Sequence, residues 1–286
     1  IRCNKELILC AGAIQSPQIL QLSGIGPEKL LKKFNIPVIV NSKYVGKNLQ
    51  DHFQSRLIVE MKDNISLNND VRRPLKLISM GMNWLFRGKG DLTVGGIQIG
   101  GGVKSKYAVS NQPDIQLGAM PFSVDRPGVP LHKFSGFTTL FWQCHPLSRG
   151  TIEIKSVDPQ ESPKIMPSYL SHELDRKTMI EGVKLIRKIH SNSPMKELIK
   201  KEVAPGTNVK SDDEILEMIK KTASTVYHPS GTCKMGESFD AVVDTDLRVK
   251  GVFGLRVVDA SVMPTIVSAN TNAATFMIAE KISEKL

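Results

Sequence analysis

GLRVVDASVMPTIVSANTNAATFMIAEK, at residues 254–281, is the stretch that decides the fold. The apolar run 255–259 predicts a short buried strand, and a tight connection with a Pro-bearing extended segment follows it. The chain then closes with a helix that we expect from about Asn272 to Lys285. The strand ends in Asp259, and an acid at the carboxyl end of a parallel strand is a typical ligand-binding position in α/β folds.

A second strand of this kind stands near the start of the chain. Residues 6–10 form a short apolar run that leads into Ala11 and Gly12, and such small residues let a ligand come close. Ser16 and Pro17 predict the start of a helix, with Ser16 as its N-cap and Pro17 in its first turn. A strand, a small-residue turn and a helix together form the repeating unit of a doubly wound α/β sheet.

The middle of the chain has a different pattern. Strand-like runs follow one another there without helices between them, which predicts an antiparallel sheet. These runs lie at 114–120, 137–144 and 150–156. Helices are expected before and after them, at Pro74–Arg87, 173–189 and 211–222. The predicted fold class is therefore α/β, α+β overall, with a partial doubly wound domain and an antiparallel-sheet domain.

Composition places the chain among ordinary globular proteins, with 41% apolar and 23% charged residues. The net charge of +10 comes from Lys and Arg spread along the chain, which favours a mildly basic surface over a nucleic-acid groove. The histidines and cysteines lack metal-ligand spacing, so no metal site is predicted. Cys10 and Cys144 lie in apolar runs and are expected to be buried, reduced thiols. No apolar run approaches the roughly 20 residues of a membrane span.

The segment VYHPSGTCKMG, at residues 226–236, carries a candidate base. Pro229 keeps the preceding residue out of the helical conformation, so His228 is expected in a loop. A histidine with a pKa near neutrality can take a proton from a hydroxyl group. The alternative is a loop histidine that caps a backbone group, and the residues alone favour that alternative. Cys233 is interpreted as a packing residue, not a nucleophile.

Three motifs together resemble the glucose–methanol–choline (GMC) family of flavoprotein oxidoreductases. They are GAIQSPQILQLSGIG at 12–26, HPSGTCKMG at 228–236 and VDASVMPTIVSANTNAATFMIAEK at 258–281. VGKNLQDH at 45–52 and PLSRGTIEIKSVDP at 146–159 are further family-like stretches. Within the family the chain is most similar to the choline dehydrogenase-like alcohol dehydrogenases.

The resemblance implies an FAD-dependent enzyme that oxidises an alcohol to a carbonyl compound, with a proton passing to a base and a hydride to flavin N5. His228 matches the family's catalytic histidine. Asn270 matches its second active-site residue, and an amide can orient the substrate oxygen without becoming charged. Asn270 is also a good N-cap for the closing helix, and the two roles are compatible.

The resemblance also implies the residues that contact FAD. They are Ala11, Gly12, Asn48, Asp259, Ala260, Asn272 and Ala273. The first turn of the closing helix has free amides and a positive dipole end, which suits the charge of a reduced flavin. For Asn48, a turn stabilised by its own side chain is the alternative.

The family's FAD fingerprint, GxGxxG after a first strand, is absent and is expected upstream of Ile1, so the sequence resembles the C-terminal part of a family member. On this interpretation residues 1–52 and 226–286 are segments of the FAD domain, and 53–225 form the substrate-binding domain. Two alternatives stay open: a hydroxynitrile lyase-like member that keeps FAD without redox use, and a catalytically incomplete fragment.

The partner expected from the resemblance is a small-molecule alcohol, without nucleic acid and without an integral membrane segment. The expected location is cytoplasmic, with peripheral association with the inner membrane as an open alternative. The identity of the alcohol, the electron acceptor and the choice between dehydrogenase and oxidase do not follow from these residues.

Overall fold

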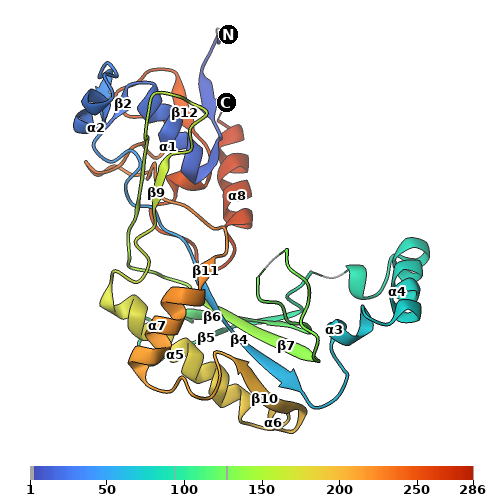
Figure 1. The fold of residues 1–286 in the computed structure, drawn as a ribbon. Helices are drawn as coiled ribbons and strands as arrows, with labels where there is room; N and C mark the ends of the chain where they lie inside the picture. The colour runs from blue at the N-terminus through green and yellow to red at the C-terminus, as the bar shows by residue number, and fades with distance from the viewer. Residues whose placement is uncertain (1–2, 94, 127, 286) are drawn as a thin grey trace. The chain divides into compact units, whose positions relative to one another are not determined.

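The computed structural model describes residues 3–93, 95–126 and 128–285, which divide into two compact units (Figure 1). The first unit contains residues up to 52, then 144–175, then those from 225 onward. The second contains Phe53–Gln143 and Arg176–Ser224. Residues 144–175, which the sequence interpretation assigned to the middle domain, therefore lie in the first unit. Helices and strands occur in both units, so the mixed fold class is confirmed.

The first unit is organised around two parallel strands. β1 (Leu7–Leu9) pairs in parallel with β12 (Leu255–Val257), although they come from opposite ends of the chain. Each is followed almost directly by a helix, α1 (Gly12–Leu22) after β1 and the short 3-10 helix η2 (Ala260–Val262) after β12. β1 and α1 form the strand–turn–helix unit that the sequence predicted at the start of the chain.

The core of the first unit lies around this pair, and α8 (Thr271–Ser283) contributes to it. Its members include apolar residues of β1, β12, α1, η2 and α8, among them Leu9, Leu20, Val257, Val262, Ile278 and Ile282. Full burial of one such aliphatic side chain stabilises a fold by roughly 1.5–3 kcal/mol. The core thereby holds the two ends of the chain together.

Smaller elements complete the first unit. β2 (Ile25–Gly26) pairs in parallel with β3 (Val40–Asn41), and α2 (Glu28–Lys33) lies between them in the chain. β8 (Thr151–Glu153) and β9 (Lys164–Met166) form an antiparallel pair. Gly24, in the turn after α1, has a φ of +79°, and a Cβ there would meet the carbonyl oxygen of Pro37 at 2.4 Å. Only glycine fits this turn.

The start of α1 differs from the prediction. The helix begins at Gly12, so Ser16 and Pro17 lie inside it. Ser16 is not an N-cap, because its hydroxyl donates to the carboxylate of Asp259. Pro17 has no N–H for the carbonyl of Ala13, four residues earlier, and the hydroxyl of Thr232 donates to that oxygen instead, at 2.7 Å. Tertiary hydrogen bonds therefore allow a helix where local signals predicted a boundary.

The burial predicted for β1 and Cys10 is wrong. Leu7 and Ile8 are 53% and 38% exposed, and Leu9 is the buried residue of the strand. Cys10 is exposed as well, whereas Cys144 is buried as expected. The reason is topological: within the described residues β1 pairs only with β12, so its other edge has no neighbouring strand.

The second unit is built on the predicted antiparallel sheet. Its strands run in the order β10-β4-β7-β6-β5, and each neighbouring pair is antiparallel. The strands are β4 (Phe53–Met61), β5 (Ile99–Val103), β6 (Ile115–Met120), β7 (Gly136–Gln143) and β10 (Ile199–Ala204). β11 (Ser224–Thr225) lies where the chain leaves this unit.

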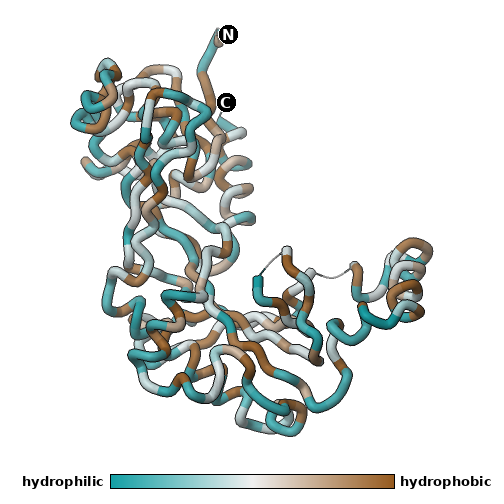
Figure 2. The backbone as a smooth tube through the Cα atoms, viewed as in Figure 1, coloured by the Kyte–Doolittle hydropathy of each residue, from teal (hydrophilic) through white to brown (hydrophobic). Residues whose placement is uncertain are grey.

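Helices also lie between residues 53 and 225. They are α3 (Leu67–Asp70), α4 (Pro74–Arg87), η1 (Asp91–Thr93), α5 (Glu173–His190), α6 (Met195–Leu198) and α7 (Asp212–Thr222). α5 packs on the sheet so closely that a Cβ on Gly182 would meet the ring of Phe141 at 2.2 Å. α4 has the predicted bounds and carries exposed apolar side chains such as Leu75 and Phe86. Hydrophobic, brown stretches alternate with hydrophilic ones along this helix in Figure 2.

Candidate active site

The loop that carries His228 is fixed by the segment 45–52. Gln50 and Ser230 exchange two main-chain hydrogen bonds, of 3.0 and 2.9 Å. The N–H of His228 donates to one oxygen of Asp51 at 3.0 Å, and the hydroxyl of Tyr169 donates to the other. Asp51 and Gln50 therefore set where the backbone of His228 lies.

The imidazole of His228 has a partner at each nitrogen. Its Nε2 lies 3.1 Å from Nδ2 of Asn270, and its Nδ1 lies 2.9 Å from Nδ1 of His52. The two imidazole rings meet edge to face, with an interplanar angle of 86°. The structure thus brings together the two predicted catalytic residues, His228 and Asn270, and adds a second histidine behind them.

Asn270 stands at the N-cap position of α8, as its residue type predicts, but its side chain makes no capping hydrogen bond. The amide is turned to His228 instead. An amide nitrogen can only donate, so this contact requires a lone pair on Nε2 of His228. The geometry therefore favours the substrate-side role of Asn270 over the capping role.

Both histidines of this pair are held in their neutral forms. Burial lowers the pKa of His228 below its usual value of 6.5, although the charge of Asp51 opposes the shift. His52 is fully buried, and this burial lowers its pKa to about 4. A low-dielectric environment disfavours the charged imidazolium. At neutral pH His228 is therefore able to accept a proton.

Asp259, a predicted cofactor residue, joins the two ends of the chain. Its Oδ2 accepts from the N–H of Gly12 at 2.9 Å and from the hydroxyl of Ser16, and its Oδ1 accepts from the N–H of Ser261 at 2.8 Å. A carboxylate has about four lone-pair sites, so three are used by the chain itself. The side chain of Asp259 thereby fixes the loop at the carboxyl ends of β1 and β12.

Asn48 has a different role from the predicted alternative of a local turn. Its φ is +62°, and its Nδ2 donates to the carbonyl of Gly231 at 3.0 Å and to that of Pro264 at 3.2 Å. The Nε2 of Gln50 donates to the same Pro264 carbonyl at 3.2 Å. Asn48 therefore ties the His228 loop to the segment that leads to Asn270.

The remaining predicted cofactor residues lie at two places in the first unit. Ala11 and Gly12 line a cavity of about 380 Å³, together with Gln15, Glu161 and Pro229, the residue after His228. Ala260 is half-buried beside Asp259, whereas Asn272 and Ala273 are exposed in the first turn of α8. The first amides of an α-helix have no helical acceptor, and they are able to bind a negatively charged group.

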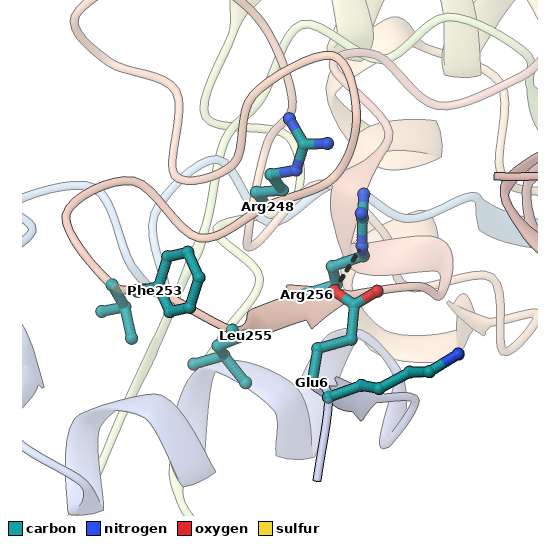
Figure 3. Close-up of a pocket in the computed structure, with 8 residues that line it drawn as sticks. Glu6, Arg248, Phe253, Leu255 and Arg256 are labelled. Atoms are coloured by element: carbon teal, nitrogen blue, oxygen red, sulfur yellow. Dashed lines mark hydrogen bonds and ion pairs between the residues drawn. The ribbon is translucent and has the colours of Figure 1, made fainter. Parts of the chain in front are cut away.

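A second cavity, of about 270 Å³, lies at the amino ends of β1 and β12 (Figure 3). Arg256 and Glu6 form an ion pair of 2.7 Å in it, and Arg248 also lines this cavity. This cavity is at the end of the strand pair opposite to Asp259 and Gly12. It therefore does not belong to the site around His228.

Three further observations on the described part of the chain concern a cysteine nucleophile, a metal site and a membrane-spanning helix. Burial raises the pKa of the Cys233 thiol, which agrees with a packing role and not with that of a nucleophile. Across residues 3–93, 95–126 and 128–285, no group of three or more His, Cys, Asp or Glu side chains could hold a metal ion. None of the helices described here is both long and apolar enough to cross a bilayer.

Sequence reasoning missed the groups that support His228. The sequence patterns assign no role to His52, Asp51 or Tyr169. The one available signal was the family-like stretch 45–52, which contains both His52 and Asp51. Its separation from His228 gives no indication that the two histidines meet.

The chain is similar to known proteins over most of its length. Family models described as GMC oxidoreductase match residues 1–54 and 146–279. Oxygen-dependent choline dehydrogenases of Yersinia pseudotuberculosis and Cronobacter sakazakii are 41% and 39% identical to 99% and 100% of the chain. The aligned regions are 50% and 51% of those relatives, so the chain spans about half the length of the curated relatives it matches.

Solved structures resemble the chain over nearly its whole length. A formate oxidase superposes with a TM-score of 0.92 at 26% identity, covering 99% of this chain and 54% of the oxidase. Pyridoxine 4-oxidase from Mesorbium loti superposes with a TM-score of 0.81 at 28% identity, covering 98% of this chain and 51% of the oxidase. With the family matches at both ends and the motifs gathered around His228 and Asp259, the chain belongs to the GMC oxidoreductase family.

Proposed function

We propose that the chain is the part of an FAD-dependent alcohol oxidoreductase that carries the catalytic base and the substrate side of the site. The observation that carries the proposal is the His228–Asn270 pair, with Nε2 and Nδ2 3.1 Å apart. It places a proton acceptor and a neutral hydrogen-bond donor side by side. The choline dehydrogenases among the relatives support an alcohol as the substrate.

In the proposed reaction the alcohol hydroxyl binds at the His228–Asn270 pair. The hydroxyl donates to Nε2 of His228 and accepts from the amide of Asn270, so its oxygen is held while its proton is removed. Asp51 holds the main chain of His228, which keeps the base in place as its ring becomes charged. FAD, when bound, supplies the acceptor for the hydride.

The residues proposed to hold FAD fit a large, partly anionic group. Ala11 and Gly12 allow a close backbone approach at the cavity beside Pro229. The exposed first turn of α8, at Asn272 and Ala273, offers main-chain N–H groups and a positive dipole end. In this proposal Asp259 and Asn48 contribute mainly by fixing the loops around Ala260 and Gly231.

Anaerobic reduction of bound flavin tests the proposal. The protein with bound FAD is mixed with choline and with a series of primary alcohols, and the visible absorbance of oxidised flavin is followed. We expect bleaching by at least one of these alcohols. A flavin that stays oxidised with every alcohol would favour the hydroxynitrile lyase-like alternative. A protein that retains no FAD would favour the catalytically incomplete fragment.

A further inference from the structure

His52 is held so that one of its ring nitrogens must carry hydrogen. Its Nε2 lies 3.2 Å from the main-chain carbonyl oxygen of Cys144. The carbonyl of Val267 is a second acceptor beside the ring. A carbonyl oxygen only accepts hydrogen bonds, so Nε2, which faces Cys144, is the protonated nitrogen of His52. The ring is fully buried, and its lowered pKa keeps it neutral. Nδ1 of His52 therefore carries a lone pair.

The contact between the two histidines then determines which ring nitrogen of His228 carries the hydrogen. The two Nδ1 atoms are 2.9 Å apart, a distance at which one hydrogen must lie between them. Since Nδ1 of His52 carries a lone pair, the hydrogen belongs to Nδ1 of His228. A neutral imidazole has one N–H, so Nε2 of His228 is left with the lone pair.

The other side of the ring leads to the same assignment. Asn270 presents its amide nitrogen to Nε2 of His228 at 3.1 Å, and this contact is a hydrogen bond only if Nε2 accepts. A chain of donors and acceptors therefore runs from Asn270 through His228 and His52 to the Cys144 carbonyl. In the opposite tautomer, with hydrogen on Nε2 of His228, the lone pairs of the two Nδ1 atoms would face each other. The Nε2–H of His228 would then face an N–H of the Asn270 amide.

We propose that His52 is a positioning residue that selects the tautomer of His228, so that Nε2 is the nitrogen that carries the lone pair and accepts the substrate proton. The inference rests on the proposed function, because it assigns the supporting group of the proposed base. His52 does not touch the substrate in this role. It acts through His228, and its ring is fully buried.

Nitrogen NMR of histidine-labelled protein tests the assignment without any turnover, because the shift of each ring nitrogen reports whether it carries hydrogen. A His228→Asn variant identifies the signals of His228. We expect Nδ1–H and an unprotonated Nε2 on His228, and Nε2–H on His52. A wild-type His228 with hydrogen on Nε2 would overturn the proposal. The result is independent of the proposed function, which is judged by flavin reduction.

Three variants separate tautomer selection from mere packing. His52→Leu removes the acceptor, and we expect mixed tautomers of His228 and flavin reduction about 10- to 100-fold slower. His52→Asn keeps a neutral acceptor and is expected to recover most of the Nδ1–H form. His190→Leu is the matched control, since His190 is also buried but bonds to Thr139 in the other unit. Unchanged His228 signals in His52→Leu would refute tautomer selection.

Discussion

The hydroxyl of Thr232 donates to the carbonyl oxygen of Ala13 at 2.7 Å, and this is the carbonyl that Pro17 leaves without a helical partner. Thr232 lies four residues after His228 and is fully buried. Pro17 thus leaves this carbonyl without its helical donor, and Thr232, in the loop of the proposed base, donates a hydrogen bond to it. The two family-like motifs at 12–26 and 228–236 are joined by this one bond.

Replacing Thr232 by valine should destabilise the protein by about 1–3 kcal/mol, because a buried carbonyl loses its donor. In a Pro17→Ala background the same change should cost less, since the alanine N–H can bond to Ala13 within the helix. Urea unfolding of wild type, Thr232→Val, Pro17→Ala and the double variant measures the coupling free energy between the two positions. Thr265→Val, at an exposed threonine, is the control. An equal cost in both backgrounds would contradict the shared-acceptor account.

His228→Ala should slow reduction of bound flavin by about 10²-fold or more, while FAD stays bound, because the base is removed and the cofactor contacts are left intact. Rapid-mixing absorbance under anaerobic conditions measures the rate. His132→Ala, at a histidine of the second unit that pairs with Asp125, should leave the rate unchanged. Near-normal reduction in His228→Ala would remove His228 from the role of base.

Stability should fall in mild acid, because His52 must remain neutral in the folded state. Its pKa is about 4 when folded and about 6.5 when unfolded, so the unfolded chain binds this proton first. The contribution is complete above about pH 6.5 and is lost as the pH falls toward 4, by about 3 kcal/mol in all. Unfolding of wild type and His52→Asn across this range should show a shallower slope in the variant. Identical slopes would contradict the assignment of this proton to His52.

The rate of flavin reduction should also fall with acid, for a separate reason. The pKa of His228 is lowered by burial, so the base is lost only as the pH drops through a value below 6.5. In an Asp51→Asn variant the opposing charge is absent, and the midpoint of the rate profile should move further down. A midpoint that moved up would show that the Asp51 carboxylate does not favour the imidazolium.

Asp259→Asn should cost about 1.5–3 kcal/mol, the range for hydrogen bonds to a charged group, because Gly12, Ser16 and Ser261 all donate to this carboxylate. Urea unfolding is again the measurement. Glu280→Gln, on the exposed part of α8, provides a control of the same chemistry. If the two variants were equally stable, Asp259 would not join the chain ends in solution.

The sequence predicted those elements whose limits are set by neighbours in the chain. α4 has the expected bounds because Pro74 stands in its first turn and Gly88 ends it with a φ of +58°. α7 begins with the expected capping box, in which Ser211 and Glu214 bond each other's main chain. In both cases the deciding contacts lie within a few residues.

Elements decided by distant residues were predicted less well. Ser16 and Pro17 have the local form of a helix start, yet Asp259 and Thr232 provide the bonds that carry α1 through them. His52 could not be recognised from spacing, because only the folded chain places it 2.9 Å from His228. The His228–Asn270 pair was found through the motif, since no local rule points an asparagine at a histidine 42 positions away.

The bond between Gly12 and Asp259 has a consequence for the order of folding. The two residues are 247 positions apart, and the whole second unit is made from chain that lies between them. Closing so long a loop is entropically costly, and contacts of high sequence separation slow folding. In the second unit β6 and β7, by contrast, are consecutive strands that pair directly. We therefore expect β6 and β7 to pair early, and the proposed active site to form only when the residues from 225 onward meet those up to 52.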